Sequence, residues 1–283
     1  MNHVIKHVLT LAFALVFTTG MAFAQSNETS ITQQTNNNDA AVTQSGQDLT
    51  ATVVQTGGNQ NQATLNQFNN PSELATVEST IRQVGFSNRA VADVSRKNSS
   101  GVISNQRQVG NNNDAFINAG AGVGGNLGNG LLQQIQIGNQ NLARMSGGDS
   151  YSADQYQDGF RNVALTSGNG KNANVTQRQI GNDNRAELNG STFSFASSEQ
   201  IQLGNDNRSI LNDVGHDGPG ESYFTRQDGG DNLVRLEANG YGGALDVRQT
   251  TDMNTALVTW TSQLNTTTIL QDGFSNRAVV NSN

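Results

Sequence analysis

The sequence predicts an all-β fold, a β-solenoid of stacked strand-turn-strand repeats of about 22 residues. Three observations predict it. One sequence template recurs at nearly constant spacing, and segments in which polar and apolar residues alternate precede its copies. The composition, low in hydrophobic residues and in proline, suits stacked strands. Only 34% of the 283 residues are hydrophobic and 6% are aromatic, which is thin for a large globular core. Pro71 and Pro219 are the only prolines, so long runs of strand pairing are possible.

The first 24 residues differ from the polar chain that follows. Lys6 precedes an apolar run over residues 8–16, and Ala22-Phe23-Ala24 has the small-x-small pattern of a cleavage site. These features predict a secretory signal peptide, residues 1–24, cleaved between Ala24 and Gln25. The apolar run is too short to span a bilayer, so we expect no transmembrane segment.

Charge and cysteine content narrow the possible partners. Without Lys6 the mature chain has 15 basic and 23 acidic residues, a net charge of −8. This balance argues against nucleic acid as a partner, which would require a basic surface. The chain has no cysteine, so disulfide bonds cannot stabilise it outside the cytoplasm.

A repeated template organises most of the chain. The heptapeptide GFSNRAV occurs at residues 85–91 and again at 273–279, within the longer template Gln-x-Gly-x-x-Asn-x-Ala. Full matches begin at Gln83, Gln108, Gln136, Gln157, Gln179 and Gln271. Near matches begin at Gln202, Gln227 and Gln249, where Ser209 and Val234 replace Ala and Thr251 replaces Gly. The nine glutamines are spaced by 25, 28, 21, 22, 23, 25, 22 and 22 residues, and such a period indicates a solenoid.

The domain organisation follows from these matches. We expect nine repeats over residues 83–283, degenerate repeats over 43–82 and a polar leader over 25–42. Within 43–82, Gln44 with Gly46, Ala51 and Gln55 reads as one copy of the template, and Gln67 begins a poorer copy that Pro71 interrupts. The glycine-rich stretches 120–130 and 215–220 are expected to be loops at one edge of the stack.

Each repeat reads as a strand, a tight turn and a second strand. Segments such as Gln200-Ile201-Gln202-Leu203 alternate with period two, as in a β-strand. Gly and Asn tolerate left-handed backbone angles, so Gly-x-x-Asn predicts the turn. The predicted turn glycines are Gly85, Gly110, Gly138, Gly159, Gly181, Gly204, Gly229 and Gly273. The Ala at the end of the template leaves room for the facing sheet, and Arg89, Arg185, Arg208 and Arg277 in the slot before it should face solvent.

Stacking explains how a polar interior can be stable. A repeat of this size cannot bury a face alone, so neighbours must stack at about 4.8 Å, with Gln above Gln and Asn above Asn. An unpaired buried amide costs free energy, but a ladder pairs each amide with its neighbours. The predicted ladder residues are Gln83, Asn88, Gln108, Asn113, Gln136, Asn141, Gln157, Asn162, Gln179, Asn184, Gln202, Asn207, Gln227, Asn232, Gln249, Asn254, Gln271 and Asn276.

This pattern closely resembles the curlin repeat of the curli fibre subunits, over roughly residues 44–283. The resemblance implies an extracellular functional amyloid of bacterial biofilms that adds head to tail. It also implies other curli subunits or a nucleator as partners, periplasmic chaperones, an outer-membrane secretion pore, and no cofactor. The family's second Gln, four residues after Ala, is retained at Gln55 but is Val94, Gly147 and Gly190 in three later repeats. An additional Gln two residues before the anchor partly replaces it, at Gln106, Gln134, Gln155, Gln177 and Gln200.

The alternatives to a fibre subunit are a disordered chain, a calcium-binding solenoid, an enzyme and a monomeric adhesin. Disordered low-complexity sequence does not explain the regular spacing, and a calcium-binding solenoid needs repeated GGxGxD, of which Gly229-Gly230-Asp231 is one partial copy. An enzyme is disfavoured, because Asp183 and Asp206 recur as turn residues and His216 is the only histidine of the mature chain. A monomeric β-helix adhesin stays open.

The two copies of GFSNRAV give a functional hypothesis. If an early and the last repeat are nearly the same, the last one can receive a second molecule where an N-terminal repeat normally stacks. Asn283 follows Ala278 by five residues, which leaves no space for a polar cap. Uncapped strand edges favour pairing with another chain, so we expect the protein to polymerise.

Overall fold

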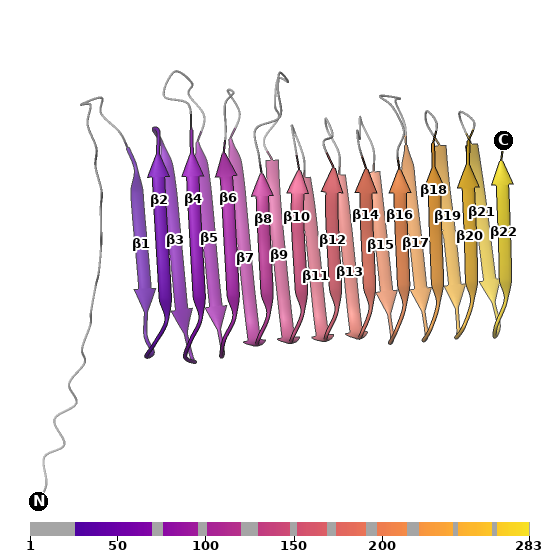
Figure 1. Cartoon of the computed structure of the whole chain (residues 1–283), viewed down its shortest axis with the longest axis horizontal. Helices are drawn as coiled ribbons and strands as arrows, with labels where there is room; N and C mark the ends of the chain where they lie inside the picture. The colour runs from indigo at the N-terminus through magenta and orange to yellow at the C-terminus, as the bar shows by residue number, and fades with distance from the viewer. Residues whose placement is uncertain are drawn as a thin grey trace, which may run out of the picture.

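The computed structural model describes residues 26–69, 76–95, 101–119, 130–147, 152–168, 174–190, 197–213, 221–239, 243–261 and 265–282. These residues form a solenoid of two parallel sheets, and the predicted all-β solenoid is confirmed. Each sheet has eleven strands in the described residues, one sheet built from odd-numbered and the other from even-numbered strands. Figure 1 shows the strands stacked in sequence order, with β1 and β22 at opposite ends of the stack.

One odd-numbered strand and the even-numbered strand after it form a coil, and we number the coils 1 to 11. The odd-numbered strands are β1 (Glu28–Gln33), β3 (Leu49–Thr56), β5 (Val77–Val84), β7 (Val102–Asn111), β9 (Gly130–Asn139), β11 (Ser152–Phe160), β13 (Asn174–Asn182), β15 (Ser197–Leu203), β17 (Ser222–Asp228), β19 (Gly243–Thr250) and β21 (Asn265–Asp272). The even-numbered strands are β2 (Asp39–Ser45), β4 (Gln62–Phe68), β6 (Arg89–Ser95), β8 (Asp114–Ala119), β10 (Leu142–Gly147), β12 (Val163–Gly168), β14 (Arg185–Gly190), β16 (Arg208–Asp213), β18 (Leu233–Ala238), β20 (Thr255–Trp260) and β22 (Arg277–Ser282).

Coils 3 to 11 contain the nine template matches. Coils 1 and 2 precede them. Strand β1 lies within the predicted leader 25–42, and β2 begins in it and ends at Ser45. Of the two expected loops, all of 215–220 and all of 120–130 except Gly130, which begins β9, lie outside the described residues. The signal peptide and its Ala24–Gln25 cleavage site also lie outside them.

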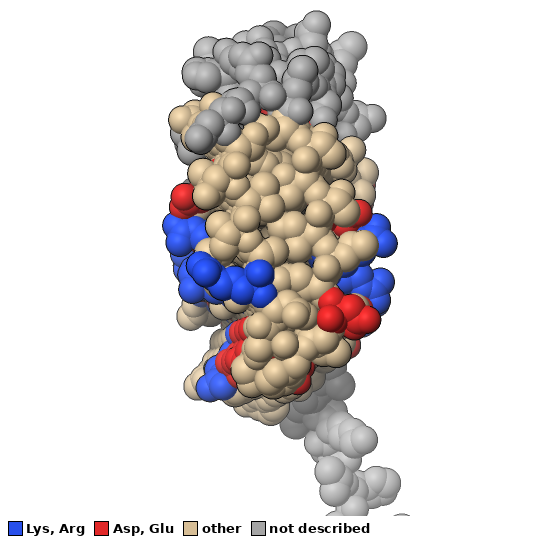
Figure 2. Space-filling view, turned by 90° about the vertical axis from the view of Figure 1, so that its right-hand side faces the viewer, with Lys and Arg blue, Asp and Glu red and all other residues tan. Residues whose placement is uncertain are grey.

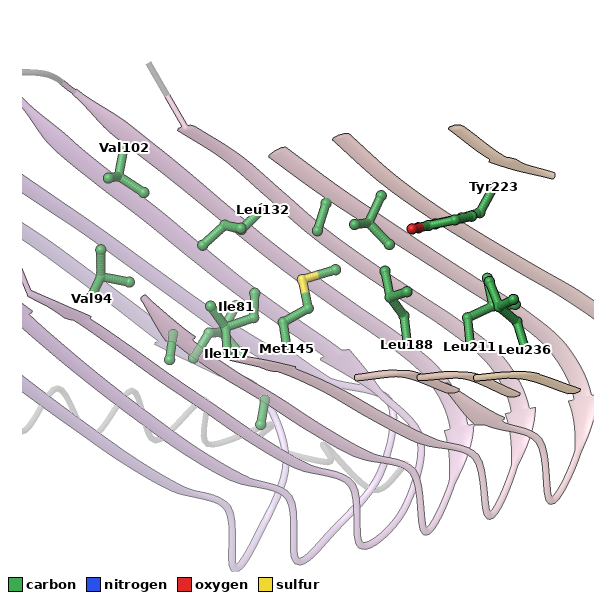
Figure 3. Packing of buried hydrophobic residues seen from close by; sticks show 14 of the residues in the cluster. Ile81, Val94, Val102, Ile117, Leu132, Met145, Leu188, Leu211, Tyr223 and Leu236 are labelled. Atoms are coloured by element: carbon green, nitrogen blue, oxygen red, sulfur yellow. The ribbon is translucent and has the colours of Figure 1, made fainter. Parts of the chain in front are cut away.

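Burial alternates along the strands because successive side chains of a strand point to opposite faces. In β3 the positions alternate between buried and half-buried from Leu49 to Thr56. Aliphatic residues from facing strands fill the space between the sheets. Figure 3 shows one such column on the even-numbered strands, with Ile117 and Met145 before Thr166 of β12 and Leu188, Leu211 and Leu236 after it.

The turns from odd to even strands lie at one edge of the stack (Figure 1), and those of coils 3 to 11 have a positive φ at the same two positions. All eight predicted turn glycines have a positive φ, between 104° and 131°. The residue two positions further on is also left-handed, with a φ of 56° at both Asp183 and Asp206. Glycine is required at these turns for a second reason: a Cβ on Gly110 would lie 1.9 Å from the carbonyl oxygen of Gly138 in the next coil.

Candidate functional site: amide ladders and end coils

A continuous ladder of glutamines follows the inner face of the odd-numbered strands. In each step the Nε2 of one Gln donates to the Oε1 of the Gln in the next coil, over 2.7–3.0 Å. The nine predicted glutamines all lie in this ladder, and Gln33 and Gln55 extend it into coils 1 and 2. From Gln55 onwards these side chains are buried.

From Gln55 to Gln271, the Nε2 of each ladder glutamine also donates to a backbone oxygen on the facing sheet. Gln83 Nε2 donates to the backbone oxygen of Gln62 on the facing sheet at 2.9 Å, and Gln179 Nε2 donates to that of Val163 at 2.9 Å. The ladder therefore links successive coils and also links the two sheets. A buried amide with both N–H groups and its oxygen paired avoids the desolvation cost of an unpaired polar group.

The asparagines form a second ladder at the tight turns. The backbone N–H of each Asn donates to the Oδ1 of the Asn in the preceding coil; Asn184, for example, donates to Asn162 at 3.1 Å. In coils 2 to 8 the Asn Nδ2 also donates to the turn glycine of the next coil, as Asn184 does to Gly204 at 2.7 Å. The predicted asparagines from Asn88 to Asn276 all occupy this position, with Asn38 and Asn61 before them.

The additional glutamines form a third ladder in the middle of the stack. Gln106, Gln134, Gln155, Gln177 and Gln200 are connected by Nε2 to Oε1 bonds of 2.7–2.9 Å. At its far end Gln200 donates to Ser209 Oγ at 2.9 Å. At its near end the buried Oε1 of Gln106 faces coil 3, where Ile81 occupies the same position, and has no hydrogen-bond partner in the described residues.

The predicted register of the first two coils was wrong. Gln55 pairs with Gln83 and is a member of the anchor ladder, not the family's second Gln. Gln44 is not an anchor, because it lies in β2 on the other sheet, where it donates to Gln67 at 2.9 Å. Gln44 and Gln67 each follow an inward alanine, Ala40 and Ala63, by four residues, so they occupy the position assigned to the second Gln.

The four arginines before the template alanine lie on the outer faces, as predicted. Arg89, Arg208 and Arg277 are exposed and Arg185 is half-buried beside Glu187. Arg161 contacts Asp183 at 2.7 Å, and this hydrogen bond raises the pKa of the guanidinium. Burial, followed by the charge of Asp158, raises the pKa of Tyr156, and burial raises the pKa of Asp154.

The described residues contain no cluster of side chains that resembles a metal or catalytic site. No group of three or more acidic or histidine side chains there could hold a metal ion. Asp183 and Asp206 are turn residues on the surface, whereas His216 lies outside the described part of the chain. The described part also contains no helix long and apolar enough to cross a bilayer.

Several inner side chains of coils 1 and 11 are only partly covered, although Thr267, Ile269 and Gln271 of coil 11 are buried. Ile31, Ala40, Val42, Ala278 and Val280 are half-buried, whereas the equivalent side chains inside the stack are buried. We call the inner residues of coil 1 the N-terminal face: Asn27, Thr29, Ile31, Gln33, Asn38, Ala40 and Val42. The equivalent residues of coil 11 form the C-terminal face: Asn265, Thr267, Ile269, Gln271, Asn276, Ala278 and Val280.

These two faces have the same residue type at all seven positions. By contrast, coil 11 shares only four of the seven with coil 10, its neighbour in the chain, which has Gly243, Leu245 and Val247 at the first three. Coil 1 shares three with coil 2. Each face therefore resembles the other more than it resembles the coil on which it stacks. The match is not apparent from the template, because coil 1 lies within the predicted leader and at its boundary.

Comparison with known proteins gives one match. Residues 24–57 match the family model of the curlin associated repeat. No curated protein and no solved structure matches the chain. The matched segment contains coil 1 and strand β3, which supply both the anchor pair Gln33 and Gln55 and the second Gln at Gln44.

Proposed function

The chain carries the curlin repeat, and from this premise we propose that it is a secreted subunit which polymerises head to tail into an extracellular, curli-like amyloid fibre. The curlin repeat and the β-solenoid fold indicate a curli-like structural subunit. The fibre and its role in biofilm matrix and adhesion are the proposed part. The match between the N-terminal and C-terminal faces is the observation that carries it.

Stacking the N-terminal face of one molecule on the C-terminal face of another would continue every inner column with an identical residue. Both coils have the same spacing from the anchor Gln to the turn Asn, five residues from Gln33 to Asn38 and from Gln271 to Asn276. Both sheets would therefore remain in register across the joint. Identical residues in register at about 4.8 Å are the arrangement of cross-β assemblies.

The direction of the hydrogen bonds is also compatible with this joint. Inside the stack each anchor Gln donates toward the C-terminal coil, and each turn Asn donates its backbone N–H toward the N-terminal coil. Across the joint, Gln271 would donate to Gln33 of the next molecule. The backbone N–H of Asn38 in that molecule would donate back to Asn276.

The C-terminal end is suited to burial against another molecule. Figure 2 looks onto this end: its middle is formed by uncharged residues, and charged residues lie along its two sides. The C-terminal face contains three aliphatic residues, Ile269, Ala278 and Val280, and no charged one. Burying it would remove apolar surface from water without desolvating a charge.

The route of export is proposed on the predicted signal peptide and on the curlin resemblance. The chain would cross the periplasm with the help of chaperones and leave through an outer-membrane pore. Other curli subunits or a nucleator would accompany it at the cell surface. We propose a structural role without catalysis or cofactor.

Seeded assembly tests the proposed function. Thioflavin-T fluorescence of purified residues 25–283 should rise after a lag phase, and preformed seeds should abolish the lag. Fibre diffraction should then give a meridional reflection near 4.8 Å. A β-rich monomer that stays soluble with seeds present would contradict the proposal and favour a monomeric β-helix adhesin.

A further inference from the structure

One outer column shows how opposite charges meet between neighbouring coils. Its members are the first residues of the even-numbered strands, each directly after a turn Asn. Arg89 and Asp114 are consecutive members in coils 3 and 4, where their strands pair side by side. Arg89 Nη1 and Asp114 Oδ1 are 3.5 Å apart, and both side chains are partly exposed.

Arg277 occupies the same position in the second copy of GFSNRAV as Arg89 does in the first. Gly85 and Gly273 have φ values of 118° and 104°, and Ser87 and Ser275 have values of 53° and 59°. The two turns thus have the same backbone conformation, and each ends in an exposed arginine. On its N-terminal side Arg277 pairs with Thr255.

Asp39 is the member of this column in coil 1. It is exposed and pairs with Gln62 on its C-terminal side. In the described residues neither Asp39 nor Arg277 forms an ion pair within the chain. If coil 1 of one molecule stacks on coil 11 of another, Arg277 and Asp39 become neighbours, as Arg89 and Asp114 are.

We propose that Arg277 of one molecule forms an ion pair with Asp39 of the next, and that this pair guides the docking of two copies of this chain. This inference rests on the proposed head-to-tail assembly. The uncharged faces supply contact area, whereas a charge pair at the rim acts on the association rate and on the choice of partner. The two copies of GFSNRAV then have equivalent roles, because each arginine meets an aspartate in the following coil, once within the chain and once across the joint.

Charge reversal tests the pair. Asp39→Arg and Arg277→Asp each place like charges at the joint, whereas the double variant restores opposite charges in reversed order. At low salt we expect each single variant to elongate on its own seeds about tenfold more slowly than wild type, and the double variant to recover to within about twofold. The difference should shrink at 1 M salt, where exposed charges are screened.

Arg208→Asp is the matched control, because Arg208 belongs to the same column inside the stack. It should elongate at the wild-type rate, and circular dichroism should show that all four variants retain the wild-type β-content. Single variants as fast as wild type, or a double variant no faster than the single ones, would overturn the ion pair while seeded growth of wild type still supports the proposed function. A wild-type chain that does not elongate on seeds would overturn both.

Discussion

At the scale of single residues, the molecule is stabilised by amides that only a stacked neighbour can pair. Gln179 accepts from Gln157 at 2.9 Å, donates to Gln202 at 2.8 Å and donates to the backbone of Val163. No position of this kind could be satisfied in an isolated coil. The polar interior and the repeat therefore depend on each other.

Removing one ladder residue should be more harmful than removing its charged neighbours. Gln179→Ala leaves one N–H of Gln157 Nε2 and the Oε1 of Gln202 buried without a partner, and we expect a loss of about 3–5 kcal/mol in the free energy of unfolding. Arg185→Ala removes only a partly exposed ion pair, so its cost should be about 1 kcal/mol or less. Urea unfolding of the freshly prepared soluble chain measures both, and the reverse order would mean that the ladder contributes little.

The near end of the third ladder gives a more selective test. In Ile81→Gln the new Nε2 can donate to the unpaired Oε1 of Gln106, so the gained hydrogen bond should offset much of the lost packing. We expect a change within about 1 kcal/mol. Val53→Gln places the same amide one coil earlier between Ile31 and Ile81, where no ladder is available, and should cost about 2–4 kcal/mol. Equal unfolding free energies for the two variants would contradict the role of the ladder end.

At the scale of elements, the tight turn allows the backbones of neighbouring coils to lie close together. Its glycine is required by its φ and by the carbonyl oxygen of the next coil. Both requirements hold at the turn glycines inside the stack, but only the first holds at Gly273 in coil 11. A Cβ on Gly273 would have no neighbour closer than Asn276 Nδ2 at 3.5 Å, whereas one on Gly181 would lie 1.9 Å from the oxygen of Gly204.

Alanine at these two turns should therefore separate folding from assembly. Gly181→Ala combines φ strain with a backbone clash and should destabilise the soluble chain by about 2–4 kcal/mol. Gly273→Ala has the φ strain alone, so we expect a loss of about 1 kcal/mol. In the fibre, however, its Cβ would meet the next molecule, and seeded elongation should slow severalfold. Normal elongation of Gly273→Ala would indicate that coil 11 is not the docking surface.

The sequence predicted the repeating elements well, because the template and the period-two alternation are local signals. It failed at the register of coils 1 and 2. In coil 1 Thr35 occupies the slot of the turn glycine, and in coil 2 the turn from Gln55 to Asn61 is one residue longer than in the other coils. The residues at Gln44 and Gly46 match the template more closely than those at Gln33 and Thr35. Only the strand pairing, however, shows on which sheet a glutamine lies. The match between the end faces was hidden for the same reason.

At the scale of the whole molecule, the stack has two ends with complementary residues and a fixed direction. Each coil contacts mainly its two neighbours, as in other solenoids. Stability should therefore grow when an end coil acquires a neighbour. The proposed fibre is the continuation of the same stack by another molecule.

A charge placed on an end face should block assembly with little effect on the soluble chain. Val280 is inward and half-buried, and Val279 beside it is outward and 49% exposed. Val280→Lys should lower seeded elongation at least tenfold, because the joint would bury an unpaired charge. Val279→Lys is the control and should elongate nearly as wild type. Similar rates for the two variants would exclude β22 from the joint.

The central claim, that coil 11 of one molecule stacks in register on coil 1 of the next, is tested most directly by spin labels. The chain has no cysteine, so Thr43→Cys and Asn281→Cys can place labels at equivalent exposed positions of β2 and β22. Within one molecule these positions are ten strand spacings apart, on the order of 48 Å, but across the joint they would be about 4.8 Å apart. We predict strong dipolar broadening in fibres of the doubly labelled chain, and none in its monomer or in fibres with either label alone. Fibres of the doubly labelled chain without broadening would contradict the account.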